Sequence, residues 1–132
     1  MTRLTIRIDF ADGTALGPGK VRLLELVAET GSIRKAAAKM KMSYRRAWLL
    51  LQALDGMFGE PLAATTTGGK AGGGARMSPL GKTVVATYRR IEAGASGIAT
   101  RDLKSLANAL ESKGKSPAVG RKTSRKLKRK PA

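Results

Sequence analysis

At 132 residues with a formal net charge of +17, the chain can bury one compact core, and its charge favours a polyanionic partner. It contains no cysteine and no histidine. These absences exclude a disulfide scaffold, a zinc finger, a catalytic thiol and the histidine-based chemistry of Ser-His-Asp hydrolases and metalloproteases.

The basic residues are concentrated at one end of the chain. Residues 113–132 carry nine Lys or Arg and no acidic residue, whereas residues 1–112 hold the other 17 basic and all nine acidic residues. A segment so charged and so poor in apolar residues cannot offset its ordering entropy, which predicts a disordered polybasic tail over 113–132. We therefore expect one folded domain over 1–112. No apolar run approaches the roughly 20 residues of a membrane helix, so we expect a cytoplasmic protein without a membrane partner.

The first part of the chain predicts a strand and three helices. Apolar and polar residues alternate over 4–10, which is the period of a strand with one buried face. Apolar residues at helical spacing predict a first helix over 20–30, a second from the cap Ser32 to near Lys41, and a long amphipathic helix over 43–58.

The next part predicts a hairpin and a further helix. The stretch 61–77 places β-branched residues before an almost all-glycine segment and a short return strand, which indicates a β-hairpin with a flexible tip. Ser78 and Pro79 then begin a helix, because serine is a good cap and proline loses no hydrogen bond at the first helical position. Gly94 and Gly97 weaken that helix, so the apolar residues beyond them belong either to its continuation or to a separate short helix.

This order of elements predicts an α+β fold: a winged helix-turn-helix domain with an N-terminal strand, a glycine-rich β-hairpin wing and a long C-terminal dimerisation helix. The turn of such a motif needs small and apolar residues on both sides, and the sequence supplies Ala36, Ala37, Met40, Met42, Ala47 and Leu50. Lys41 stands in the turn where glycine is common, so we expect a modest conformational penalty there.

The helix over 43–58 is the predicted recognition helix. Its apolar positions face inward and leave Tyr44, Arg45, Arg46 and Leu49 exposed at the N-terminal end, the part that usually reaches base edges. Arginine can pair bidentately with guanine in the major groove. Two arginines on an arbitrary helix are more often a solvated face, but the preceding turn pattern favours DNA contact here. Trp48 has the spacing of a core residue.

The glycine-rich tip admits two interpretations. A nucleotide-binding P-loop fails, because Ala64 stands where its first glycine belongs and Ala71 follows the lysine in place of Ser or Thr. If the segment is the tip of a wing, Lys70 meets a phosphate or the minor groove of DNA, and Arg76 flanks it. In the alternative interpretation, the glycines form only a flexible hairpin turn.

Carboxylates give no sign of a metal or catalytic site. The closely spaced pairs, Asp9 with Asp12 and Glu25 with Glu29, have no third ligand nearby, and we assign them to loop and helix-surface roles. We expect no metal, no cofactor and no enzymatic activity, since no nucleophile with an activating partner is visible.

The sequence resembles the N-terminal DNA-binding domain of the molybdate-responsive ModE regulators. The resemblance rests on GSIRKAAAKMKMSYRRAW at 31–48, TGGKAGGGARMSPLG at 67–81 and Tyr88, and covers roughly residues 4–112. LysR-type regulators share the looser helix-turn-helix but not this glycine-rich wing. By position, the resemblance implies DNA contacts at Ser43, Tyr44, Arg45, Arg46, Gly69, Lys70, Gly72, Gly73 and Arg76.

The resemblance also implies a homodimer formed through the helix that begins at Pro79 and part of the first helix. The stripe Leu80, Val84, Tyr88 and Ile91 supports this expectation, because it would otherwise be exposed. Full-length members of the family continue into oxyanion-binding domains, whereas this sequence continues into the basic tail. We therefore expect a stand-alone DNA-binding version with no small-molecule site of its own, and with molybdate not bound by this chain.

Three functional hypotheses remain open at this point. The first is a dimeric regulator that binds specific sites on double-stranded DNA, with the recognition helix 43–58 in the major groove and the wing 61–77 on the backbone or minor groove. The second is a nucleoid-associated protein that coats DNA with little specificity. The third is a basic RNA-associated structural protein, which the scarcity of aromatic residues disfavours.

Overall fold

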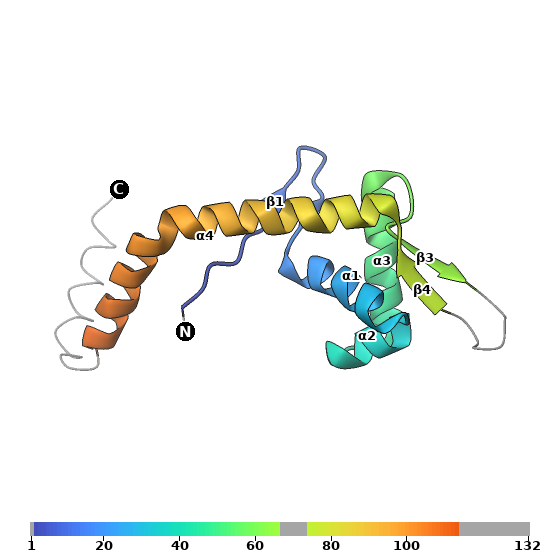
Figure 1. Cartoon of the computed structure of the whole chain (residues 1–132), viewed down its shortest axis with the longest axis horizontal. Helices are drawn as coiled ribbons and strands as arrows, with labels where there is room; N and C mark the ends of the chain where they lie inside the picture. Colours follow the sequence, from blue (N-terminus) through green and yellow to red (C-terminus); the bar gives the residue numbers. More distant parts are fainter. Residues whose placement is uncertain (1, 67–73, 114–132) are drawn as a thin grey trace. The chain divides into compact units, whose positions relative to one another are not determined.

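The computed structural model describes residues 2–66 and 74–113. The described residues divide into two units, Thr5–Ala93 and a second that holds residues 2–4 and 94–113. The first unit contains three helices, two short antiparallel hairpins and the beginning of a fourth helix (Figure 1). The predicted tail beyond Lys113 lies outside the described residues.

Three helices form the centre of the first unit. They are α1 (Pro18–Thr30), α2 (Ile33–Lys39) and α3 (Tyr44–Phe58), close to the predicted ranges. Gly31 ends α1 in the left-handed conformation, with φ 71°, and its amide donates to the Val27 carbonyl at 2.8 Å. The predicted stop after the first helix is therefore confirmed.

The N-terminal strand is shorter than predicted. Only Ile8–Asp9 (β1) form a strand, which pairs antiparallel with Ala15–Leu16 (β2), a second strand that was not predicted. The turn between them is closed by Asp12, whose Oδ1 accepts from the backbone amide and the hydroxyl of Thr14 at 2.9 and 2.7 Å. These bonds to the charged form lower the pKa of Asp12. The segment 11–19 thus contains the strand that pairs with β1, although its glycines are typical of a loop.

The second hairpin is the predicted wing. Strands β3 (Ala63–Thr66) and β4 (Gly74–Met77) pair antiparallel, with Ala63 opposite Met77 and Thr66 opposite Gly74. Its base is tied to the helices: the Ala75 amide donates to the Gly31 carbonyl at 3.0 Å, and the Leu62 amide donates to Oδ1 of Asp55 on α3 at 3.0 Å. These bonds fix the wing relative to the C-terminus of α1 and to α3.

Helix α4 runs continuously over Pro79–Lys113. Ser78 caps it as predicted, because its hydroxyl oxygen accepts from the Gly81 amide at 3.0 Å and donates to the Pro61 carbonyl at 2.8 Å. The question left open at Gly94 and Gly97 is settled in favour of continuation. Among the described residues, no helix is long and apolar enough to cross a membrane.

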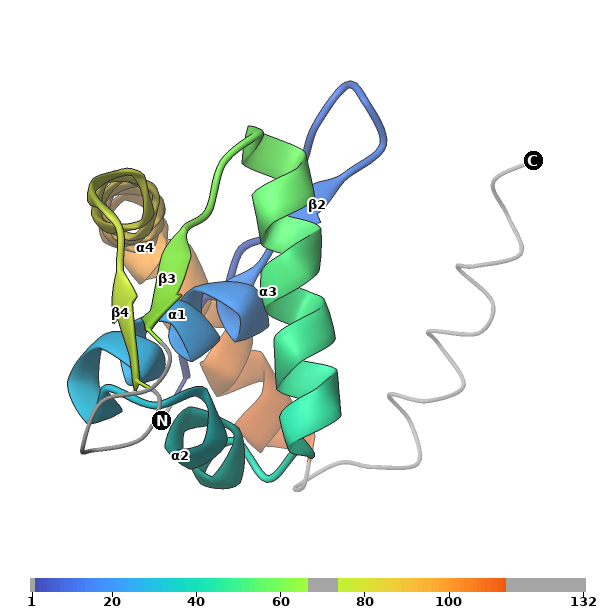
Figure 2. The ribbon, with the colours of Figure 1, turned by 90° about the vertical axis from the view of Figure 1, so that its right-hand side faces the viewer.

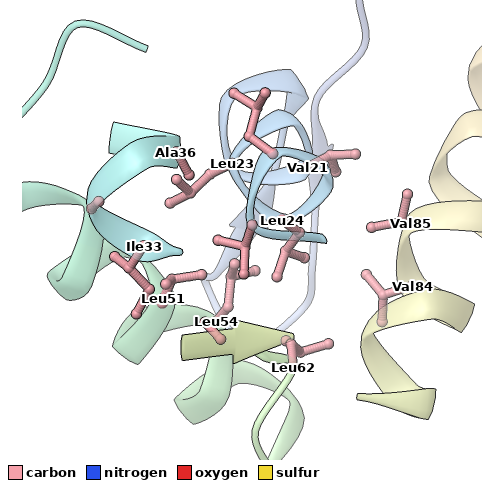
Figure 3. Packing of buried hydrophobic residues seen from close by; sticks show 14 of the residues in the cluster. Val21, Leu23, Leu24, Ile33, Ala36, Leu51, Leu54, Leu62, Val84 and Val85 are labelled. Atoms are coloured by element: carbon pink, nitrogen blue, oxygen red, sulfur yellow. The ribbon is translucent and has the colours of Figure 1, made fainter. Parts of the chain in front are cut away.

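The core joins α1, α2, α3, the base of the wing and the first turns of α4. Figure 3 shows its leucine and valine side chains pointing toward one another from these elements. The largest fully buried side chains are Tyr88, Leu23, Leu24, Leu54, Leu62, Val21 and Val27. At about 25 cal/mol per Å² of apolar surface removed from water, this cluster is the main favourable contribution to folding.

The burial of Tyr88 and Val84 corrects the predicted dimer stripe. Both are buried within the chain, and the Tyr88 hydroxyl donates to the Ile6 carbonyl at 2.6 Å. Burial raises the pKa of this phenol. Two members of the stripe are therefore core residues, because the first turns of α4 pack on α1 and the wing of the same chain and not on a second copy.

An ion-pair network holds α1 to α4. Arg89 donates through Nε and Nη2 to the two carboxylate oxygens of Glu25 at 2.9 and 2.8 Å, and through Nη1 to Glu92 at 2.7 Å. The bond from Arg89, together with Arg22, holds the pKa of Glu25 below its usual value. The helix-surface role predicted for Glu25 is thus an interhelical bridge.

Candidate nucleic-acid interface

The turn between α2 and α3 positions the candidate interface. Ser32 and Ser43 cap the two helices, with each hydroxyl oxygen accepting a backbone amide of the following turn at 3.0 Å. The Met42 amide donates to the Ala37 carbonyl at 3.0 Å across the turn. Ala37 and the facing Ala47 are buried, and their small side chains let the helices approach closely. Figure 2 shows α2 lying at the N-terminal end of α3.

The turn contains the strained position that the sequence predicts. Lys41 has φ 57°, and no other non-glycine residue in the described ranges has positive φ. A left-handed conformation costs a residue with a Cβ roughly 1–2 kcal/mol. This position marks where the chain reverses between the two helices, and it leaves the Lys41 side chain exposed beside α3.

The N-terminal turns of α3 present the predicted base-reading residues to solvent. Arg45 and Arg46 are exposed, and with Ser43 and Leu49 they line a surface hollow of about 300 Å³. Leu49 is 46% exposed, which agrees with its predicted place on the outer face. Ser43 already accepts a backbone amide, so its hydroxyl has a proton left to donate. The hollow therefore combines guanidinium donors with an apolar surface.

Trp48 corrects the prediction that it belongs to the core. It is 41% exposed, next to Tyr44, which is 43% exposed. Residues four apart share one face of a helix, and the core side of α3 is filled by Ala47, Leu51 and Leu54. The sequence already placed Tyr44 on the outer surface, so the same spacing was the signal that Trp48 accompanies it.

Arg34 is a cation that the sequence analysis missed. It lies on α2 with its guanidinium 4.8 Å from the centre of the Tyr44 ring, within the range of a cation–π interaction. The contact brings a third arginine to the N-terminal turn of α3. No local sequence pattern predicts this contact, because Arg34 and Tyr44 lie ten residues apart on two different helices.

A further hollow of about 410 Å³ adjoins the first, since Arg46 and Leu50 of α3 line both. Arg46 lines it together with Arg7 and Lys20. Arg7 pairs with Asp9 at 2.9 Å, and the Lys20 ammonium donates to the Ala15 carbonyl at 3.0 Å. Arg46 has no carboxylate within ion-pairing distance in the described part of the chain, and it is the cation of this hollow best placed to bind an anion.

The structure describes only part of the predicted wing site. Arg76 is exposed on β4, in register with Ala64 of β3. The other wing residues assigned to DNA contact, Gly69, Lys70, Gly72 and Gly73, lie outside the described residues. Within the described ranges, no group of His, Cys, Asp or Glu side chains could hold a metal ion.

Residues 19–82 match the family of bacterial regulatory helix-turn-helix proteins of the lysR type. The chain is 39% identical to the molybdenum-pterin-binding protein MopB of Rhodobacter capsulatus over 94 residues, which are 71% of this chain and 35% of that protein. It is 36% identical to the molybdenum transport protein ModE of Azotobacter vinelandii over 92 residues, 70% of this chain and 33% of that protein. The chain thus spans about a third of the length of these relatives.

Among solved structures, the chain is similar to a complex of the CbnR DNA-binding domain with DNA. The identity is 26% and the TM-score 0.49, over 64% of this chain and 93% of that one. The predicted resemblance to ModE regulators agrees with the curated relatives. The helices, turn and hairpin described above form a winged helix-turn-helix fold, and residues 19–82 are similar to the bacterial regulatory helix-turn-helix proteins of the lysR family.

Proposed function

We propose that the chain is a transcription regulator that binds specific sites on double-stranded DNA. The N-terminal turns of α3 enter the major groove, and the wing contacts the backbone or the minor groove. The observation that carries the proposal is the exposure of Arg45 and Arg46 directly after a helix-turn-helix turn, where arginine can reach base edges.

The proposed contacts divide into two kinds. On α3, Arg45 and Arg46 are base-reading candidates, whereas Ser43 and Tyr44 flank them at the helix start. On the wing, Arg76 and the glycine-flanked Lys70 are candidates for backbone contact, and the resemblance to ModE regulators adds Gly69, Gly72 and Gly73. Phosphate contacts set position and affinity, and base contacts set sequence preference.

We further propose that two copies bind together. With Val84 and Tyr88 occupied inside the chain, the apolar residues left exposed on α4 are Ile91, Ile98, Leu106 and Leu110. Exposed apolar residues that recur along one helix indicate a surface that a partner covers, and Ile98 is the most exposed of the four at 89%. A dimer also doubles the DNA sequence that is read. Light scattering at micromolar concentration should give the dimer mass, and a monomer would contradict this part of the proposal.

The same proposal makes the protein a regulator and not an enzyme, acting in the cytoplasm where bacterial DNA lies. The relatives MopB and ModE carry molybdenum in their names, so genes of molybdenum metabolism are the first candidates for its targets. Residues 113–132 form the proposed polybasic tail, which adds phosphate contacts without reading bases; all of them except Lys113, the last residue of α4, lie outside the described part of the chain.

The net charge of +17 specifically favours a second candidate, a nucleoid-associated protein that coats DNA. Competition at physiological salt between the upstream region of its own gene, random DNA and RNA separates the two. A regulator should prefer some genomic sites by at least about 10³-fold over random DNA. Mapping the bound DNA across the genome finds those sites, whereas uniform coverage would favour the nucleoid function.

A further inference from the structure

A hollow of about 320 Å³ lies between α2, α3 and the wing strands. It is lined from α2 by Ser32 and Arg34, from α3 by Tyr44 and Trp48, and from the hairpin by residues that include Thr65 and Thr66. These elements meet at the end of the domain where α3 begins, as Figure 2 shows. The hollow therefore lies between α3 and the wing, the two elements that are proposed to contact DNA.

One wall of this hollow is apolar. Trp48 is the only tryptophan of the chain, and it leaves 41% of its surface in water beside Tyr44. Tryptophan is among the most apolar and largest side chains, so its burial against a ligand releases more free energy than that of most residues. The two aromatic residues form a continuous shelf, because they stand one helical turn apart.

The rest of the lining includes a cation and hydroxyl groups. The guanidinium of Arg34 is held over the Tyr44 ring at 4.8 Å, and no carboxylate of the described chain lies within ion-pairing distance of it. None of the residues lining the hollow is acidic. Thr65 and Thr66 are exposed and carry further donors. An arginine oriented by an aromatic ring, without a counter-charge, is arranged to bind a phosphate.

An apolar shelf beside an arginine and hydroxyl groups matches the chemistry of one repeating unit of a nucleic-acid backbone, which has an apolar sugar and a charged phosphate. The phosphate would lie at Arg34 and the threonines, and the deoxyribose carbons would pack on Trp48. With α3 in the major groove and the wing beyond it, one DNA strand must pass between the two. We propose that this hollow seats a phosphate and the adjoining deoxyribose of that strand, with Arg34 and Trp48 as DNA-contacting residues. The inference rests on the proposed DNA-binding function.

Trp48 supplies a direct test, because all tryptophan fluorescence of the chain comes from this one side chain. In the free protein its exposure predicts ready quenching by acrylamide. On addition of a duplex that carries a preferred site, the emission should shift to shorter wavelength and quenching should fall by about half or more. Unchanged quenching in the saturated complex would overturn the proposal. A matching shift with inorganic phosphate alone would also overturn it, in favour of a small-anion site.

The phosphate contact is tested by combining an Arg34→Ala variant with duplexes in which single phosphates are replaced by neutral methylphosphonates. For the wild type, one position in each half-site should weaken binding by about tenfold, the value of one charge-assisted hydrogen bond. Arg34→Ala should lose a similar factor on unmodified DNA and nothing further at that position. It should also reduce the dependence of log affinity on log salt by about 0.9 for each lost contact.

Arg90→Ala is the matched control, since it removes an exposed arginine of α4 that does not line the hollow. It should keep the wild-type response to every methylphosphonate. If the losses from Arg34→Ala and the methylphosphonates multiply at all positions, Arg34 does not contact a phosphate. Failure of the wild type to prefer any site over random DNA would refute the regulator function itself, whereas a selective wild type without this coupling refutes only the role of the hollow.

Discussion

Replacing Gly81 by alanine should destabilise the protein strongly, although alanine is the better helix former. Gly81 lies in the first turn of α4, against the base of the wing. A Cβ there would overlap the Leu62 carbonyl oxygen and stand 2.6 Å from Cγ of Met77. The same carbonyl accepts the Ser78 amide at 2.9 Å, so its displacement also weakens that bond. Overpacking of backbone and one weakened hydrogen bond together cost roughly 2–4 kcal/mol.

The matched control is Gly94→Ala in the same helix. Nothing lies within 4 Å of a Cβ at Gly94, so this substitution should raise stability by roughly 0.5–1 kcal/mol through helix propensity alone. Urea unfolding followed by circular dichroism measures both free energies of unfolding. In thermal unfolding, the midpoint temperature of Gly81→Ala should lie at least about 8 °C below that of the wild type. If both variants gain stability equally, the wing base does not pack on α4 as described.

Three other perturbations have defined outcomes. Lys41→Gly should stabilise the chain by roughly 0.5–1 kcal/mol by relieving the left-handed strain at φ 57°, whereas a loss in thermal unfolding would contradict the turn geometry. Arg89 lowers the pKa of Glu25, so the bridge between them stabilises the fold above the ordinary pKa of 4.5 and loses this effect as the pH falls through the lowered value. The difference in free energy of unfolding between wild type and Glu25→Gln should therefore shrink below pH 4.5. A difference that stays constant with pH would argue against the bridge. Deleting residues 113–132 should weaken specific and random DNA binding alike. The slope of log affinity against log salt concentration should become shallower by about 3–4 if four phosphate contacts are lost, while an unchanged slope would assign the tail another role.

Most helices could be predicted from the sequence because their signals are local. Caps, glycine stops and apolar spacing act within one or two turns, and Ser32 and Ser78 cap their helices as expected. The short β1–β2 pair was missed since it depends on contacts between residues on opposite sides of a turn. Continuity of α4 through Gly94 was undecidable, because glycine weakens a helix without breaking it.

The candidate site shows where pattern alone was insufficient. The exposure of Arg45 and Arg46 followed from helical spacing. The exposure of Trp48 contradicted an assignment to the core made from its helical spacing, because a helix with a filled core side leaves a large apolar residue outside when it shares a face with an exposed neighbour. Arg34 reaches the site through its contact with Tyr44, ten residues away in sequence, and no local pattern encodes that approach.

The most direct test of base reading by α3 compares the variants Arg45→Ala and Arg46→Ala with wild type on a preferred site and on random DNA at the same salt concentration. Loss of a bidentate contact to a base should reduce the preference for the site by about 1–3 kcal/mol, while random binding falls much less. Arg90→Ala, which removes an exposed charge from α4, should leave the preference unchanged. If either arginine variant of α3 loses specific and random binding by the same factor, that arginine contacts only the backbone, and if both do, the proposed recognition helix does not read sequence through them.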